Sequence, residues 1–313
     1  MRLRHLLLFF VLFFYSNTTT VNAQGSVSLI TNPSYPEAGE SYNVSVSGVS
    51  DPFAKVLWYK DGKAQPELGN VRSIRVQAKG IGVSERISAE VISRSGEGGN
   101  VSRTIVPVRT DILISADTLV PPFYKGRKLG SSGTTITATA LVFYGSPKDT
   151  GSLTYLWRVG NKVQNGGVPS TQNSIQFSSG FEDELLVSVG IFRKGIQIAE
   201  KAIVVPIVEP ELYFYEKNPL RGLSSVALKS PHHFTGEELL LRAEAYFVDT
   251  DVANAEVERT WKVNNRTVEG EVNDPYELTI QKQVSGGLSK ISFSLQNMAK
   301  LLQGVSGSLG VQF

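Results

Sequence analysis

The sequence predicts an all-β protein made of three tandem β-sandwich domains. Three observations predict this class: a phrase that occurs three times, a composition with 29 glycines and 14 prolines, and short alternating apolar segments between turn residues. Hydrophobic residues make up 41% of the 313 residues, which argues against a disordered chain. The length suits two or three domains, and three phrases favour three.

The repeated phrase centres on the only three tryptophans of the chain, Trp58, Trp157 and Trp261. They lie about 100 residues apart, which is the spacing of a domain repeat rather than a solenoid repeat. At the same offset after each tryptophan comes a dipeptide suited to a tight hairpin. These dipeptides are Asp61-Gly62, Gly160-Asn161 and Asn264-Asn265.

Asp-Gly and Asn-Asn tolerate the positive φ that type I′ turns require, so each tryptophan should lie on a strand that turns back at once. A tryptophan on the third strand of an all-β unit of about 100 residues is typical of an immunoglobulin-like sandwich. We therefore expect Trp58, Trp157 and Trp261 to be structural core residues, each stabilising its domain by about 3 kcal/mol. Because the chain has no cysteine, packing alone must hold these cores.

The N-terminus predicts a signal peptide. Arg2 and Arg4 precede an apolar run at residues 6–15, and Val21-Asn22-Ala23 before Gln24 forms a small-x-small cleavage pattern. The run is shorter than the roughly 20 residues of a membrane span, so an uncleaved anchor is the less favoured alternative. We expect an exported protein, located at the cell surface, in the periplasm or outside the cell.

The expected domain boundaries follow from the phrases and the proline-containing breaks. The linkers between domains are short, which predicts little freedom between neighbours and suits a structural spacer. The expected segments are a signal peptide at residues 1–23 and immunoglobulin-like sandwiches at 24–109, 110–208 and 209–313.

The charge of the chain gives no lead to a polyanionic partner. The formal net charge is +2, and Arg2 and Arg4 leave with the signal peptide, so the mature chain is neutral. A neutral set of domains has no overall attraction to nucleic acid or to an anionic membrane. We expect no nucleic acid among its partners.

Catalytic machinery is not visible in the sequence. His5 belongs to the signal peptide, while His232 and His233 follow Pro231 in what we expect to be a solvated turn. No Gly-x-Ser-x-Gly motif is present. We therefore expect no enzyme and no cofactor. Asp249 and Asp251 are weak calcium candidates, and a solvated turn is the favoured alternative.

Aromatic residues provide the candidate contacts. Tyr59, Tyr213 and Tyr215 are candidates for stacking on a ligand, and the alternative is that they cover an outer sheet face. Residues 121–124 match the Pro-Pro-x-Tyr ligand of intracellular WW modules, a coincidence in an exported chain. We expect their aromatic rings to pack against the base of the second domain.

The tandem Trp-turn units resemble bacterial PKD-like and immunoglobulin-like surface domains. A narrower resemblance is to exported proteins of unknown function from candidate-phyla bacteria. This chain departs from them at Ala245, where proline is expected, and at Val248, where phenylalanine is expected. The resemblance implies a cell-envelope setting beside pilus or secretion machinery, and no catalytic residues. It rests on Pro121–Gly126, Phe214-Tyr215-Glu216, Pro219-Leu220, Gly222 and Ala243–Phe247.

Three functional hypotheses follow. The first is a non-enzymatic exported envelope protein that acts as a spacer or as an adhesion or interaction module, with other envelope proteins as partners. The second is a carbohydrate- or peptidoglycan-binding module that uses exposed aromatic residues. The third, an enzyme, is least favoured because no acid–base constellation is visible.

Overall fold

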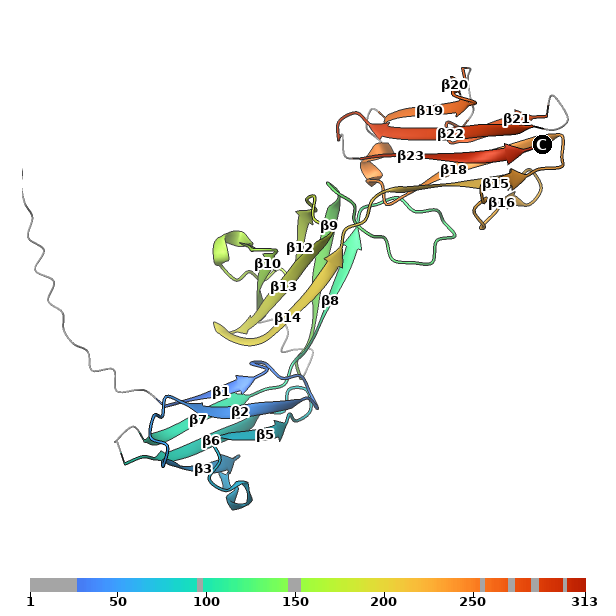
Figure 1. Ribbon diagram of the computed structural model, residues 1–313. Coiled ribbons are helices and arrows are strands. Elements are labelled where there is room, and N and C mark those ends of the chain that lie inside the picture. The colour runs from blue at the N-terminus through green and yellow to red at the C-terminus, as the bar shows by residue number, and fades with distance from the viewer. Residues whose placement is uncertain are drawn as a thin grey trace, which may run out of the picture. The chain divides into compact units, whose positions relative to one another are not determined.

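The computed structural model describes residues 27–94, 98–145, 153–253, 257–269, 274–282, 287–300 and 303–313. The expected signal peptide at residues 1–23 lies outside the described residues. Within these ranges the regular elements are β-strands and short 3₁₀ turns (Figure 1). The strands form pairs of facing sheets, which confirms the predicted all-β fold of tandem immunoglobulin-like sandwiches.

The first sandwich packs a sheet in the order β1-β2-β5 against a sheet in the order β4-β3-β6-β7. Residues alternate between core and solvent, so β2 buries Tyr42 and Val44. Tyr42 donates a hydrogen bond of 3.0 Å to the buried carboxylate of Glu85, and Lys60 pairs with that carboxylate at 2.7 Å. The elements are β1 (Ser28–Asn32), β2 (Ser41–Ser47), β3 (Lys55–Lys60), β4 (Lys63–Ala64), η1 (Pro66–Leu68), β5 (Ser73–Gln77), β6 (Glu85–Ile92) and β7 (Gly99–Ile105).

The second sandwich repeats this plan, with sheets in the orders β12-β9-β8 and β11-β10-β13-β14. Alternation is clear on β13, which turns Leu185, Val187, Val189 and Ile191 into the core. The elements are β8 (Arg109–Ala116), β9 (Thr135–Phe143), β10 (Leu153–Val159), β11 (Lys162–Val163), η3 (Asn165–Gly167), β12 (Ser174–Ser178), β13 (Glu184–Arg193) and β14 (Ile196–Pro206).

The third sandwich has sheets in the orders β16-β15-β18-β21 and β17-β23-β22-β19-β20. His232 and His233 form β17, a two-residue strand that pairs in parallel with Val311 and Gln312, so they do not lie in the solvated turn that we expected. The elements are β15 (Glu211–Asn218), β16 (Gly222–Leu223), β17 (His232–His233), β18 (Glu238–Tyr246), η4 (Thr250–Ala253), β19 (Val257–Val263), β20 (Arg266–Thr267), β21 (Glu277–Gln281), β22 (Leu288–Asn297) and β23 (Gly304–Gln312).

Each tryptophan strand turns back at once, as predicted, because β3, β10 and β19 pair with the two-residue strands β4, β11 and β20. Both residues of the Asp61-Gly62 and Asn264-Asn265 turns have positive φ, as type I′ turns require. In the Gly160-Asn161 turn the positive φ is at Gly160, the pattern of a type II′ turn.

The chain divides into two compact units. The first draws on residues 27–34, 41–77 and 84–105, and the second on 35–40, 78–83 and 106–313. The second and third sandwiches therefore belong to one unit, although each has its own core. The expected boundaries of three separate domains stay a prediction.

Candidate functional site

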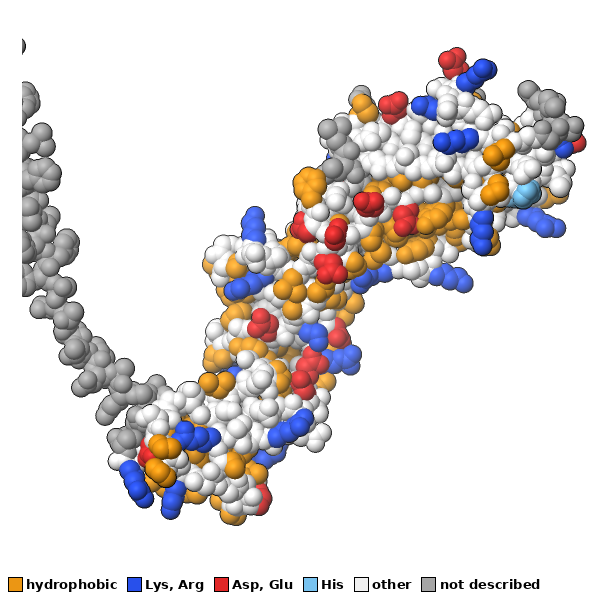
Figure 2. All heavy atoms as spheres, in the orientation of Figure 1, with side chains coloured by type: hydrophobic (Ala, Val, Ile, Leu, Met, Phe, Trp, Pro, Cys, Tyr) orange, Lys and Arg blue, Asp and Glu red, His pale blue; other side chains and the backbone are white. Residues whose placement is uncertain are grey.

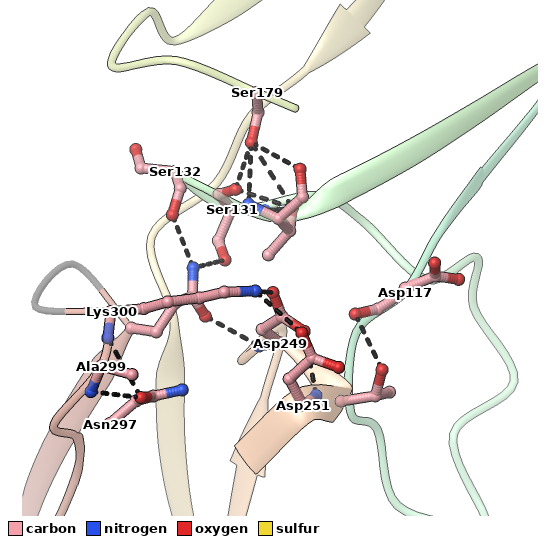
Figure 3. A network of polar contacts seen from close by, with 12 residues as sticks. Asp117, Ser131, Ser132, Ser179, Asp249, Asp251, Asn297, Ala299 and Lys300 are labelled. Atoms are coloured by element: carbon pink, nitrogen blue, oxygen red, sulfur yellow. Dashed lines mark hydrogen bonds and ion pairs between the residues drawn. The ribbon is translucent and has the colours of Figure 1, made fainter. Parts of the chain in front are cut away.

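The second and third sandwiches meet at a polar junction formed by segments far apart in the sequence (Figure 3). Leu119, in the loop after β8, donates to the carbonyl of Val248 at 2.7 Å, and Phe247 donates to the carbonyl of Leu119 at 2.8 Å. Thr118 and Asp249 form an isolated antiparallel bridge. We call residues 117–119, 131–132, 247–251, 300 and 303 the junction.

Phe247 shows that the junction fixes the backbone. Its φ is +61°, a left-handed conformation that is rare for a bulky residue and costs on the order of 1–3 kcal/mol. The ring is buried, and the carbonyl accepts a 2.6 Å hydrogen bond from the hydroxyl of Ser131. Contacts from the second sandwich thus hold a strained residue of the third.

Gln303 is the central side chain of the junction and is fully buried. Its amide nitrogen donates to the Ser131 hydroxyl at 3.1 Å and to the Ser132 carbonyl at 2.5 Å. Its amide oxygen accepts from the backbone N–H of Asp249 at 2.7 Å. One amide therefore joins the turn before β9 to the segment after β18 and to the hairpin between β22 and β23.

Charge is also paired at the junction. The Lys300 ammonium lies 2.6 Å from a carboxylate oxygen of Asp249, which is buried, and 2.9 Å from one of Asp251, which is exposed. Hydrogen bonds to Asp249 and Asp251 raise the pKa of Lys300, because they favour its charged form. Asn297 orders this turn, since its side-chain oxygen accepts from the backbone of Ala299 and Lys300.

Buried hydroxyls anchor the second-sandwich side of the junction. Thr134 donates to the Ser131 carbonyl at 2.7 Å, and Ser179 donates to the same carbonyl at 2.5 Å. Ser131, Thr134 and Ser179 are all buried, so their polar groups are paired as burial demands. The Ser131 hydroxyl is thereby held in position for Phe247 and Gln303.

Aromatic packing flanks the polar network. Phe123 packs edge-on against Tyr215 with ring centroids 5.1 Å apart, and Tyr124 packs against Tyr246 at 5.7 Å and Phe247 at 6.0 Å. The loop at residues 117–130 therefore lies on the third sandwich. This corrects our expectation that these rings would pack against the base of the second domain.

The three predicted core tryptophans are all buried, with 2%, 1% and 5% of Trp58, Trp157 and Trp261 exposed. The indole N–H of Trp58 donates to the Val71 carbonyl at 2.8 Å, and that of Trp261 donates to Pro275 at 3.1 Å. The indole N–H of Trp157 has no hydrogen-bond partner among the described residues.

The three candidate stacking tyrosines differ in exposure. Tyr215 is buried, and its hydroxyl lies 2.6 Å from that of Tyr246. The expectation that Tyr215 stacks on a ligand is therefore wrong, because its ring packs in a hydrophobic cluster with Tyr246 and Phe247. Burial raises the pKa of Tyr215. Tyr213 is 41% exposed and donates to Glu211.

Tyr59 is the candidate that borders a groove. It is partly exposed and its hydroxyl donates to Glu90 at 3.1 Å. The groove, of about 340 Å³, crosses β3, β6 and β7 on the outer face of the first sandwich. It is lined by Tyr59, Arg86, Ser88, Glu90, Asn100 and Ser102 among others.

The weak calcium candidates lie together, but their immediate cation is Lys300. In the described part of the chain no group of three His, Asp or Glu side chains is placed to hold a metal ion. Calcium binding by Asp249 and Asp251 stays a prediction. It would show as a rise in melting temperature on adding calcium, and an unchanged melting temperature would contradict it.

Sequence reasoning missed the residues that carry the junction. Ser131 and Gln303 look like ordinary turn residues, and nothing in the sequence marks the positive φ of Phe247. The available signal was the long loop with four consecutive apolar or aromatic residues at 120–123, which is more than a turn requires. An unpaired apolar loop indicates a surface that must be covered.

Comparison with known proteins adds a fold likeness. No family model matches the chain, and neither does any curated protein. Among solved structures it is similar to fibronectin(III)-like modules of Clostridium thermocellum CbhA, at 15% identity and a TM-score of 0.22, over 64% of this chain and 93% of that one. It is also similar to immunoglobulin domains 1–5 of Sidekick-1, at 13% identity and a TM-score of 0.24, over 88% of this chain and 57% of that one.

A third similar structure is SGBP-B from a Bacteroides ovatus mixed-linkage glucan utilization locus, solved with a mixed-linkage heptasaccharide. The identity is 11% and the TM-score 0.22, over 90% of this chain and 67% of that one. At such scores none of these likenesses carries an argument about function. Separately, no helix in the described ranges has the length and hydropathy needed to cross a membrane.

Proposed function

We propose that this chain is a non-enzymatic, exported cell-envelope protein that acts as a structural spacer or as an adhesion and interaction module. Its second and third sandwiches serve as one stiff element. The observation that carries the stiff element is Gln303, a fully buried amide whose nitrogen donates to Ser131 and Ser132 of the second sandwich, while its oxygen accepts from Asp249 of its own sandwich. A hinge would leave such groups to water.

Calorimetry tests the stiff element. The second and third sandwiches should unfold in one transition, because separating them would expose the buried junction. Replacing both Ser131 and Gln303 by Ala should split that transition into two. Two transitions in the unaltered unit, each insensitive to these substitutions, would contradict the proposal.

Export has its own test, independent of the junction. Residues 1–23 fused to alkaline phosphatase, an enzyme that is active only after export, should give active enzyme outside the cytoplasm. A fusion with Leu6 and Leu8 replaced by Asp should not, because the apolar run would be broken. If the fusion with the unaltered residues 1–23 also gave no active enzyme, the assignment to the cell envelope would be wrong.

The same proposal includes partners among other envelope proteins, beside pilus or secretion machinery.

A second candidate function, carbohydrate binding, is favoured by the groove beside Tyr59. Its lining combines the aromatic ring of Tyr59 with the small side chain of Ser88 and the polar groups of Arg86 and Glu90. A sugar would need such a combination of an apolar ring and hydrogen-bonding groups. Retention on an immobilised neutral polysaccharide should be lost in Tyr59→Ala. Tyr213→Ala is the matched control, since that partly exposed ring belongs to the third sandwich and does not line the groove. Equal retention of both variants would exclude the groove.

A further inference from the structure

Two segments that lie against the junction are basic and contain no acidic residue. Residues 118–130 hold Lys125, Arg127 and Lys128, and residues 217–236 hold Lys217, Arg221 and Lys229. The Lys217 ammonium is paired with Glu277. The other five side chains are exposed. A chain with a formal net charge of only +2 therefore concentrates cations in two segments.

The fold brings these segments together. Phe123, Tyr124 and Leu129 of the first segment pack against the cluster of Tyr215, Tyr246 and Phe247, and so do Leu223 and Ala227 of the second. Figure 1 shows the loop after β8 beside the β15–β16 hairpin. In Figure 2, Lys and Arg side chains lie along the lower and right side of a hydrophobic patch on the third sandwich, and Asp and Glu side chains lie at its upper left.

The second segment also carries apolar side chains that stand in water. Leu220, at the tip of the β15–β16 hairpin, is 97% exposed, and Val226 is 71% exposed. Hydrogen bonds hold the turn at this tip, because the Asn218 side chain accepts from the backbone N–H groups of Leu220 and Arg221 at 2.9 and 3.1 Å. An ordered hairpin that presents a leucine beside an arginine is not explained by the junction.

We propose that these two segments form a surface that binds an anionic lipid bilayer, with Leu220 inserted among the lipids and the five cations on the headgroups. Each exposed cation is attracted to anionic headgroups, and burial of a leucine side chain among the lipids adds to that attraction. The exposed leucine favours lipid over a soluble anionic polymer, because a polymer offers no apolar phase to receive it. Acidic residues directly flank both segments, at Asp117, Glu216 and Glu237, so the proposal rests on the five exposed cations and Leu220 and not on a surface free of carboxylates.

Vesicle co-sedimentation of the full chain tests the proposal. The chain should bind vesicles of phosphatidylcholine and phosphatidylglycerol, and bind pure phosphatidylcholine much more weakly. The triple variant Lys125→Gln, Arg127→Gln, Lys128→Gln should weaken binding about a hundredfold, and Leu220→Ser about tenfold. The apolar run at residues 6–15 is the same in every variant, so it does not account for differences between them.

A charge-matched control separates this surface from general electrostatics. The triple variant Lys55→Gln, Lys63→Gln, Arg75→Gln removes three exposed cations from the first sandwich and should leave binding unchanged. Equal weakening by both triple variants would overturn the proposal. So would an unchanged affinity for Leu220→Ser, or binding to the soluble polyanion heparin without binding to the anionic vesicles.

Discussion

The second and third sandwiches use the same stretch of the fold in opposite ways. In the second, the loop between its first two strands leaves its own sandwich: Leu119 packs against the third core and Phe123 against Tyr215. In the third sandwich, the equivalent stretch pairs with strands of its own sandwich: β16 pairs with β15, and β17 pairs with β23. The sandwich fold therefore does not fix the path of the connection between its first two strands. The side chains of that connection determine whether it packs on its own sandwich or on the neighbouring one.

The joining loop carries Phe123 and Tyr124, whereas the equivalent stretch of the third sandwich carries Phe234. Loop 117–130 has no strand partner in its own sheets between Asp117 and Leu129, so its apolar residues need an external surface. The third sandwich offers that surface at Tyr215 and Tyr246. Because the loop of one sandwich packs on the other, a substitution that destabilises one sandwich should also destabilise its neighbour.

The largest effect should come from the core tryptophans. Trp157→Ala and Trp261→Ala should each destabilise by about 3–5 kcal/mol, because a buried indole leaves a large cavity. If the two sandwiches are one unit, either variant should lower the unfolding midpoint of both. Leu288→Ala, at a 67% exposed position, is the control. Chemical denaturation, followed by probes in each sandwich, measures this; a loss confined to the mutated sandwich would break the comparison.

Removing the central amide should have the next effect. Gln303→Ala leaves the Asp249 N–H and the Ser131 hydroxyl short of partners in a buried site, at a cost of about 1–3 kcal/mol. Gln281→Ala, on the exposed edge strand β21, should change stability by less than about 0.5 kcal/mol. Equal values from urea denaturation for the two variants would show that the junction adds no stability.

The β-sandwich architecture could be predicted from the sequence, and the contacts of the junction could not. Alternation and the Trp-turn offset are local signals, so β3, β10 and β19 and their hairpins could be predicted. The hydrogen bond of Gln303 to Ser131 spans 172 residues, and no local pattern encodes a partner at that separation. Tyr215 was misplaced for the same reason: its neighbour Phe123 comes from another sandwich.

The indole N–H groups sharpen the comparison on a smaller scale. Trp261→Phe removes a donor and leaves the Pro275 carbonyl unpaired, whereas Trp157→Phe removes a buried donor that has no partner among the described residues. The substitution should therefore cost about 1 kcal/mol less at Trp157 than at Trp261. Paired denaturation curves decide it, and a larger loss at Trp157 would show that its N–H is satisfied in solution.

The smallest effect concerns pH. The pKa of Lys300 is raised in the folded state, so its ion pairs stabilise fully below the ordinary lysine value of 10.5 and are lost as pH rises through the higher folded value. With a side chain 37% exposed, the gain should stay below about 1 kcal/mol. Lys300→Gln should flatten this alkaline loss of stability relative to Lys262→Gln, an exposed control. Identical alkaline profiles would contradict the role given to Lys300.

The most direct measurement of the central claim is the distance between the second and third sandwiches in solution. The chain has no cysteine, so spin labels can be placed by Lys162→Cys and Lys290→Cys without competing thiols. Double electron–electron resonance should give one narrow distance distribution between the two labels. The double variant Ser131→Ala, Gln303→Ala should broaden that distribution. A broad distribution in the labelled but otherwise unaltered chain would contradict a stiff junction.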